Sequence, residues 1–323
     1  MRKIETSESP SPLRGYLAVT AAAACWGSSG IFIKLIMTGS GMTATALAFW
    51  RDIGAFLLFL TICGLFRRNG LRVHRSDWPW LVCMGVSLGL FHVSWNLGIL
   101  INGPAVTTVQ QAAMPVIVLV VARFAWGERL NWQKLGAAFL IVIGTVFVSG
   151  ILSTGGQPLT VHGLIAGFCV PVFYAGWSMF GKQVRGRYSA EVVLTYAFGI
   201  AALVLLPFQF RIGFFWPMSP WIWTWYAGLI GLATGGGFFA YTYGLGHLPA
   251  GVASILVMTE ILFVSVYSFF LLNEMMTPME SAGAVLVIGG VVLLFQRKEK
   301  RPAAEKVHHP NLNSKPYEEE SGS

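Results

Sequence analysis

Ten stretches of the sequence are predominantly apolar over about 20 residues, the length that an α-helix needs to cross the hydrocarbon core of a bilayer. Only 11% of the 323 residues are charged, whereas a soluble domain carries roughly 25%. Lipid rather than water must therefore cover most of the surface. The sequence predicts an all-α integral membrane protein with ten transmembrane helices, at approximately residues 14–37, 43–66, 77–101, 103–126, 131–150, 160–181, 189–210, 219–245, 248–272 and 277–296.

The positive charges are distributed unevenly between the connections of these predicted helices. If the N-terminus is inside, the outside loops hold only Arg211. The inside segments hold Arg2, Lys3, Arg14, Arg67, Arg68, Arg72, Arg75, Arg129, Lys134, Lys182, Arg185, Arg187, Arg297, Lys298, Lys300 and Arg301. Cytoplasmic loops of membrane proteins carry such an excess of Lys and Arg. We therefore expect both termini in the cytoplasm, in a bacterial-type inner membrane. Because the basic residues lie in short loops, the net charge of +8 does not indicate nucleic-acid binding.

The two halves of the chain resemble each other. The matching residues are Gly15 with Gly163, Trp26 with Tyr174, Lys34 with Lys182, Pro104 with Pro249, Glu128 with Glu274 and Gly144 with Gly290, at spacings of 145 to 148 residues. Each half then contains five predicted helices. Because five is odd, the second half enters the membrane from the opposite side, which predicts an inverted-topology repeat with a pseudo-two-fold axis in the membrane plane.

This repeat divides the chain into two helical units with polar segments around them. We expect a cytoplasmic N-terminal segment at 1–13, a first five-helix repeat at 14–150, a periplasmic linker at 151–159, a second five-helix repeat at 160–296 and a disordered cytoplasmic tail at 297–323.

Several short motifs occur in the same order in both halves. The first half has Ala22–Gly27 (AAACWG), then Arg51, Pro115 and Gly127-Glu128; the second half has Gly246–Gly251 (GHLPAG) and Asn273-Glu274. In these motifs the chain resembles the EamA-type transporters of the drug/metabolite transporter superfamily, over roughly residues 14–296. The resemblance implies a ten-helix secondary transporter, and family members named for their substrates mostly export amino acids and related metabolites. Two departures stand out: Glu260 occupies the place of Pro115, and Arg51 has no counterpart in the second half.

Few ionisable residues lie inside the predicted helices. Each costs roughly 2.5–3.5 kcal/mol at the centre of a bilayer helix and usually faces a bundle interior or a water-filled cavity. Glu260 could bind a proton or a substrate ammonium group, and His92 could titrate near neutral pH, so both are candidates for ion coupling. A structural ion pair with Arg51, or a hydrogen bond to backbone, is the alternative for Glu260. We interpret Arg51 and Asp52 as structural charges that tie helices together.

Polar and aromatic side chains well inside the helices are candidates for substrate binding, because an aromatic cavity suits an apolar, aromatic or cationic ligand. Packing between helices is the alternative for the aromatic residues. The candidate substrate-binding residues are Trp26, His92, Trp95, Asn96, Gln110, Gln111, Tyr174, Trp177, Tyr241, Tyr243 and Glu260.

The sequence thus favours a secondary transporter of small organic metabolites, which exports amino acids or related compounds by alternating access at a midplane cavity. Uptake or exchange of another solute, such as a nucleoside, sugar or choline-like cation, stays open, and a membrane-embedded enzyme or a scaffold ranks below both. The sequence has no nucleotide-binding, metal-ligand or catalytic motif. We expect no cofactor, with a small-molecule substrate and the lipid bilayer as partners and a homodimer as an open arrangement.

Overall fold

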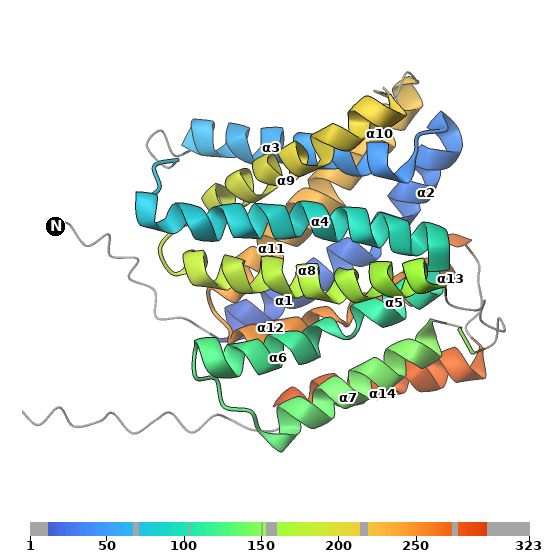
Figure 1. Ribbon diagram of the computed structural model, residues 1–323. Coiled ribbons are helices and arrows are strands. Elements are labelled where there is room, and N and C mark those ends of the chain that lie inside the picture. Colours follow the sequence, from blue (N-terminus) through green and yellow to red (C-terminus); the bar gives the residue numbers. More distant parts are fainter. Residues whose placement is uncertain are drawn as a thin grey trace, which may run out of the picture.

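The computed structural model describes residues 12–66, 71–102, 104–149, 151–152, 160–213, 219–272 and 277–295, and every regular element among them is helical (Figure 1). Segment 1–11, most of the predicted 151–159 linker and the predicted tail at 297–323 lie outside the described residues. The elements are α1 (Pro12–Gly27), α2 (Ser29–Ser40), α3 (Ala44–Phe66), η1 (Arg75–Asp77), α4 (Trp78–Asn102), α5 (Pro104–Gln111), α6 (Met114–Ala125), α7 (Trp132–Val148), α8 (Val161–Arg185), α9 (Ala190–Ile212), α10 (Pro220–Gly228), η2 (Leu229–Gly236), α11 (Gly237–Leu245), α12 (Ala250–Val257), α13 (Glu260–Leu272) and α14 (Pro278–Phe295).

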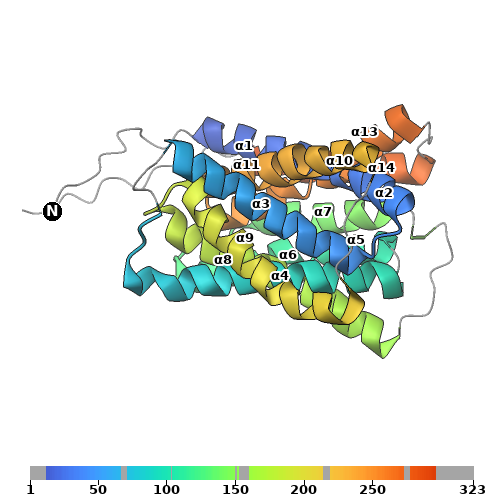
Figure 2. The ribbon, with the colours of Figure 1, turned by 90° about the horizontal axis from the view of Figure 1, so that it is seen from above.

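The long helices run in one general direction, as both views of the ribbon show (Figures 1 and 2). Within the described residues, seven helical stretches are long and apolar enough to cross a membrane: Pro12–Ser40, Thr45–Phe66, Arg75–Gly98, Val106–Ala125, Val161–Arg185, Ala190–Ile212 and Ala250–Tyr267. Two shorter apolar helices, Trp132–Val148 and Pro278–Leu294, accompany them. The prediction of an all-helical, multi-pass membrane protein is therefore confirmed for the part of the chain that the structure describes.

Four of the predicted transmembrane spans are interrupted, although the apolar pattern predicts uninterrupted helices. The span 14–37 consists of α1 and α2, 103–126 of α5 and α6, and 248–272 of α12 and α13. The span 219–245 contains the π-helical segment η2 between α10 and α11. Apolar composition alone does not register such breaks, because the residues on both sides of each break are as apolar as those of a continuous helix.

The breaks have local causes in the backbone. Pro115 has no N–H to donate, so the chain before it tightens and the Ala113 N–H bonds the Gln110 carbonyl three residues back. In the breaks between α1 and α2 and between α12 and α13, a hydroxyl side chain bonds the helix backbone. Ser28 donates to the Cys25 carbonyl at 2.6 Å and Thr259 donates to the Leu256 carbonyl at 2.8 Å. Hydroxyl side chains that bond backwards in this way compete with the helical ladder and bend helices.

The helices pack in pairs that come from different halves of the chain. α3 packs against α9 and α7 packs against α14, while α4 lies along α8 and α1 lies along α11. At the end of the bundle where α1 begins and α14 ends lie the α3–α4, α6–α7 and α8–α9 connections (Figure 1). The basic residues of the described connections are concentrated at this end, which we call the basic end; the opposite end contains the α2–α3 and α9–α10 connections.

One close contact between these helices involves two glycines, one in α7 and one in α14. A Cβ added at Gly283 would lie 2.7 Å from the Gly144 carbonyl oxygen, and one added at Gly144 would lie 2.8 Å from the Gly283 carbonyl oxygen. Small residues allow two helix backbones to approach in this way, which is a common mode of packing inside membranes.

Replacing Gly283 by Leu is expected to destabilise the folded protein, because the side chain must push against the α7 backbone. Overpacking of this kind costs about 1–3 kcal/mol. Gly289→Leu is the matched control, since a Cβ at Gly289 of the same helix meets no atom within 4 Å. Thermal unfolding in detergent should show a lower midpoint for Gly283→Leu and an unchanged one for Gly289→Leu. Equal midpoints for the two variants would contradict the close packing.

Candidate functional site

The four interruptions of the helices surround one cavity. Its volume is about 780 Å³, and its wall includes residues next to the breaks, namely Ser29, Gln111, Ala112, Met258 and Glu260. A smaller inner chamber of about 60 Å³ shares six lining residues with it and is therefore continuous with it. Thr234, within the π-helical segment, lines the inner chamber. Irregular backbone at membrane depth is tolerated where it lines a cavity, and π-helical turns occur frequently at functional sites.

The cavity extends towards the end of the bundle opposite the basic end. Thr38 and Gly39 lie in the last turn of α2, and Trp221 lies in the first turn of α10; all three line the large cavity. These two helix ends lie at the end of the molecule that is farther from the α6–α7 connection (Figure 1).

A cluster of buried aromatic rings forms the floor of the cavity on the side of the basic end. Trp26 contacts Tyr174, with ring centroids 6.2 Å apart, and Phe238, at 4.9 Å. Trp177 stacks on Tyr241 at 5.2 Å, and the Tyr241 hydroxyl is 2.7 Å from the Ser178 hydroxyl. Within the described structure, not every hydrogen-bond donor of this floor has a partner. The indole N–H groups of Trp26 and Trp177 are buried without an acceptor in the described part of the chain.

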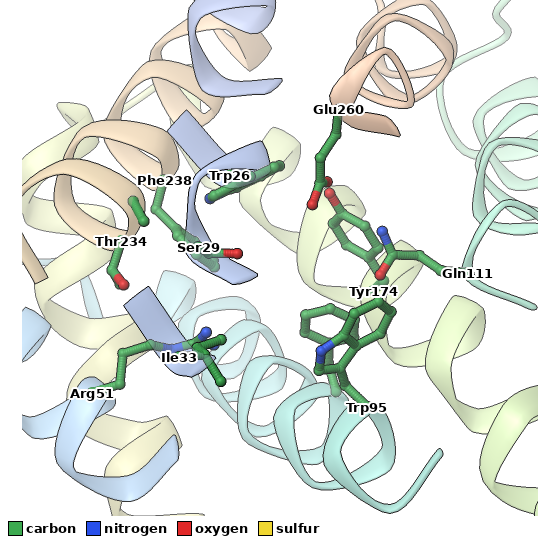
Figure 3. Close-up of a pocket in the computed structure, with 12 residues that line it drawn as sticks. Trp26, Ser29, Ile33, Arg51, Trp95, Gln111, Tyr174, Thr234, Phe238 and Glu260 are labelled. Atoms are coloured by element: carbon green, nitrogen blue, oxygen red, sulfur yellow. The ribbon is translucent and has the colours of Figure 1, made fainter. Parts of the chain in front are cut away.

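Glu260 is the first residue of α13 and its carboxylate faces the inner chamber (Figure 3). A negative charge at a helix N-terminus is favoured by the partial positive charge of the unpaired backbone N–H groups. Among the described residues, the carboxylate makes no hydrogen bond and no ion pair. A carboxylate in this position is available to a cation or a proton that enters the chamber.

Arg51, Asp52 and His92 form a buried group between α3 and α4. The Arg51 guanidinium bonds His92 Nε2, and His92 Nδ1 lies 2.9 Å from an Asp52 carboxylate oxygen. Since the carboxylate can only accept and the guanidinium can only donate, Nδ1 must carry the proton and Nε2 the lone pair. The two neighbours therefore favour neutral His92. The guanidinium also lines the inner chamber, in a different part of the wall from Glu260 (Figure 3).

The structure brings part of the predicted site together. Trp26, Trp95, Gln111, Tyr174 and Glu260 line the inner chamber. So does Arg51, which the sequence analysis interprets as structural only. Asp52 is fully buried and bonded to His92 on the neighbouring helix.

The other predicted residues lie away from the lining of the two chambers. His92 is behind Arg51, and Trp177 and Tyr241 are in the floor. Gln110 accepts a hydrogen bond from Asn102 at 3.2 Å, and Asn96 belongs to α4 outside the lining. Tyr243 packs on His247 at 4.4 Å, near the C-terminal end of α11.

Sequence reasoning missed several lining residues. Phe91, Thr234 and Phe238 line the inner chamber, and Trp225 and Tyr267 line the large cavity. Nothing in an apolar helix distinguishes a phenylalanine that faces a cavity from one that faces lipid. Ser29 also lines both chambers and was likewise not predicted.

Comparison with protein families gives the decisive observation about identity. The model of the EamA-like transporter family matches this chain twice, at residues 13–150 and 161–296. The chain belongs to the EamA-like transporter family. It is accordingly a membrane transporter of small molecules and not an enzyme.

Relatives of this EamA-like transporter match it over nearly its whole length. It is 26% identical to the inner membrane transporter YicL of Salmonella typhimurium, over 90% of this chain and 98% of the relative. It is 23% identical to the transporter YwfM of Bacillus subtilis (90% and 97%) and 23% identical to the pseudopaline exporter CntI of Pseudomonas aeruginosa (80% and 88%). A protein of known crystal structure has the same fold, with a TM-score of 0.72 at 18% identity, over 87% of this chain and 96% of that one.

In this EamA-like transporter the Gly127-Glu128 motif helps to close the basic end. Gly127 has a positive φ of 64° at the turn between α6 and α7. Glu128 then accepts hydrogen bonds from the backbone N–H groups of Ala250 and Gly251, at 2.7 and 3.3 Å, and so caps the N-terminus of α12. The Lys182 ammonium group donates to two carbonyls of the same α11–α12 corner, each at 2.6 Å.

Proposed function

We propose that the protein is a secondary transporter that exports amino acids or related small metabolites by alternating access. One observation carries the proposal. A carboxylate that is unpaired within the described structure, that of Glu260, faces an aromatic cavity at the point where broken helices meet. The α-ammonium group of an amino acid is a natural partner for such a carboxylate, and its apolar side chain suits the aromatic wall.

We infer that the chain forms ten transmembrane helices as two inverted five-helix repeats, at 14–150 and 160–296. The packing pairs support this inference. If the halves are exchanged, the α4–α8 contact becomes the α11–α1 contact, while α3–α9 and α7–α14 map onto themselves. α3 and α9 each have 23 residues. The breaks at Ala112-Ala113 and Met258-Thr259 fall within one residue of the 145-residue spacing found in the sequence.

Alternating access follows from such a repeat, because the two halves can exchange conformations and so expose one site to either side. The aromatic floor is the barrier in the present conformation. The buried indole N–H groups of Trp26 and Trp177 lack acceptors within the described part, and each such group costs about 1–3 kcal/mol. Opening the floor to water or substrate would satisfy them, which lowers the free energy of the other conformation.

The direction of transport is proposed from the relatives and the substrate class from the cavity. One relative of similar length is named as an exporter. A choline-like cation is the second candidate substrate, because a carboxylate surrounded by aromatic rings also suits a quaternary ammonium group. The same cavity would then bind the cation through Glu260 and the faces of Trp26, Trp95 and Tyr174.

A flux experiment tests this function. The purified full chain would be reconstituted into liposomes loaded with a mixture of labelled amino acids or with labelled choline. We expect saturable release of at least one amino acid, absent from protein-free liposomes. Release of choline alone would favour the second candidate, and the absence of protein-dependent release for both would contradict the proposal.

We further propose that both termini are cytoplasmic, with the cavity open to the periplasm. In a cysteine-free background, a cysteine at Ser219 at the start of α10 should react with a membrane-impermeant maleimide added to whole cells. A cysteine at Arg129, in the α6–α7 connection, should react only after the cells are opened. The reverse pattern would contradict this orientation, and both positions are exposed in the structure.

A further inference from the structure

We propose that Arg51 binds the carboxylate of a zwitterionic substrate, while Asp52 and His92 hold its guanidinium in place. This proposal rests on the proposed function and deepens it, since it defines the substrate class by two opposite charges. The spacing of residues along the sequence indicates only an architectural role for Arg51, whereas the geometry of the inner chamber points to binding.

The inner chamber contains two opposite charges. Arg51 from α3 and Glu260 from α13 both line it, and they lie in different parts of its wall (Figure 3). Within the described structure no ion pair within 4.0 Å joins them, so the two charges do not neutralise each other directly. A chamber with one cation and one anion held apart is complementary to a ligand that carries an ammonium group and a carboxylate group.

The guanidinium of Arg51 has N–H donors that are not all used within the described structure. It has five N–H donors; one N–H at Nη2 bonds His92, and the buried Nε has no acceptor among the described residues. An unpaired buried donor on a charged group is unfavourable. A carboxylate in the chamber can accept two parallel N–H bonds from one guanidinium, and such charge-assisted bonds are roughly twice as strong as neutral ones.

Asp52 compensates the charge of Arg51 from a distance. No direct ion pair within 4.0 Å joins Asp52 to Arg51 in the described structure; neutral His92 stands between them and bonds both. Asp52 is fully buried and therefore compensates the positive charge without covering the guanidinium. Asp52 and His92 are thus positioning residues, and the face of Arg51 towards the chamber stays available to a ligand.

The size of the two chambers divides the ligand into two parts. The inner chamber of about 60 Å³ accommodates a small charged head group, whereas the adjoining cavity of about 780 Å³ accommodates a large body. The walls of the larger cavity include Trp95, Trp225 and Tyr267. The ligand class is therefore an amino acid, or a compound with the same head group, that has a large apolar or aromatic side chain.

Three indole compounds separate the contributions of the two charges. L-tryptophan has both charged groups, tryptamine has only the ammonium group and indole-3-propionate has only the carboxylate. Binding of each to the purified full chain would be measured by calorimetry. We expect L-tryptophan to bind the wild-type protein at least about tenfold more tightly than either of the others, because each charged hydrogen bond lost corresponds to a factor of about 10 to 100.

Each variant should bind more weakly only those compounds that carry the group its residue recognises. Arg51→Gln should lose about tenfold or more for L-tryptophan and indole-3-propionate, with a change of less than about threefold for tryptamine. Glu260→Gln should lose affinity for tryptamine and L-tryptophan but not for indole-3-propionate. Arg211→Gln is the control, since Arg211 is exposed in the last turn of α9 and should leave all three affinities unchanged.

The positioning role has its own test at His92. Glutamine offers an N–H to Asp52 and a carbonyl oxygen to Arg51, so His92→Gln should retain the wild-type order of affinities. His92→Leu offers neither, and should weaken binding of the two carboxylate-containing compounds in the same way as Arg51→Gln.

Several outcomes would overturn the proposal. Equal affinity of the wild-type protein for L-tryptophan and tryptamine does so without any variant, so the test does not depend on the folding of Arg51→Gln. An equal loss of all three compounds in well-folded Arg51→Gln, or no binding of any of them, also overturns it. The proposed function survives each of these results if reconstituted protein still releases another amino acid or choline, and fails only if it releases neither.

Discussion

Glu260→Gln is expected to reduce transport by at least about tenfold while leaving the protein folded. The variant keeps the shape of the side chain and removes its negative charge, and a charge-assisted hydrogen bond to a substrate ammonium group contributes about 1.5–3 kcal/mol. Folding should be nearly unaffected, because the carboxylate has no partner among the described residues whose loss would destabilise the native state. Flux from liposomes and thermal unfolding of the same preparation would measure both quantities.

Glu280→Gln is the matched control for this prediction. Glu280 is an acid in the first turn of α14, outside the cavity, where its carboxylate accepts a bond from the Thr277 backbone N–H at 2.7 Å. A glutamine can accept the same bond, so flux should stay at the wild-type level. Wild-type flux in folded Glu260→Gln, measured across a range of pH, would remove Glu260 from the transport mechanism.

Asp52→Ala is expected to destabilise the protein by about 1–3 kcal/mol, the cost of leaving the buried N–H group of His92 without its acceptor. Asp52 is fully buried, and in its absence the Arg51 charge would have no anion compensating it through His92. Thermal unfolding in detergent should therefore show a large fall in the midpoint, or a loss of folded protein during purification.

Asp77→Ala provides a comparison between two buried aspartates. Asp77 is 3% exposed and pairs with Arg187 at 2.5 Å, but the Arg187 side chain is 64% exposed and can return to water. The loss should be smaller than for Asp52→Ala, although Asp77 also accepts a bond from Tyr188. Combining Arg51→Leu with Asp52→Leu should restore part of the stability, since it removes both charges. Equal effects of the two alanine variants would contradict the role assigned to Asp52.

The sequence predicts the positions of the helices well because the bilayer imposes one simple requirement on each of them. A stretch of about twenty apolar residues between polar connections can be recognised without knowledge of the tertiary structure. The predicted spans 43–66 and 189–210 agree with α3 and α9 to within about two residues at each end. The same apolar pattern does not show where the helices are interrupted. Backbone bonds from Ser28 and Thr259 cost little apolar character, so a pattern based on hydropathy cannot locate them.

The site is less predictable because it depends on which way a side chain faces. Helical geometry places neighbouring residues about 100° apart, which argues that Arg51 and Asp52 cannot both face one pocket. In the structure only Arg51 lines the chamber, and yet both residues contact His92, because they bond different nitrogens of its ring. Side-chain length and the position of α4 decide this arrangement, and neither is visible in the spacing of residues along one helix.

The buried group of Arg51, Asp52 and His92 also has a consequence for the synthesis of the protein. α3 precedes α4 along the chain, so Arg51 and Asp52 reach the translocon before His92 does. Each charge opposes insertion by about 2.5–3.5 kcal/mol on biological insertion scales, and only the apolar remainder of α3 favours it. The second membrane segment therefore depends on the arrival of the third, and the pair is expected to leave the translocon as a helical hairpin rather than one helix at a time.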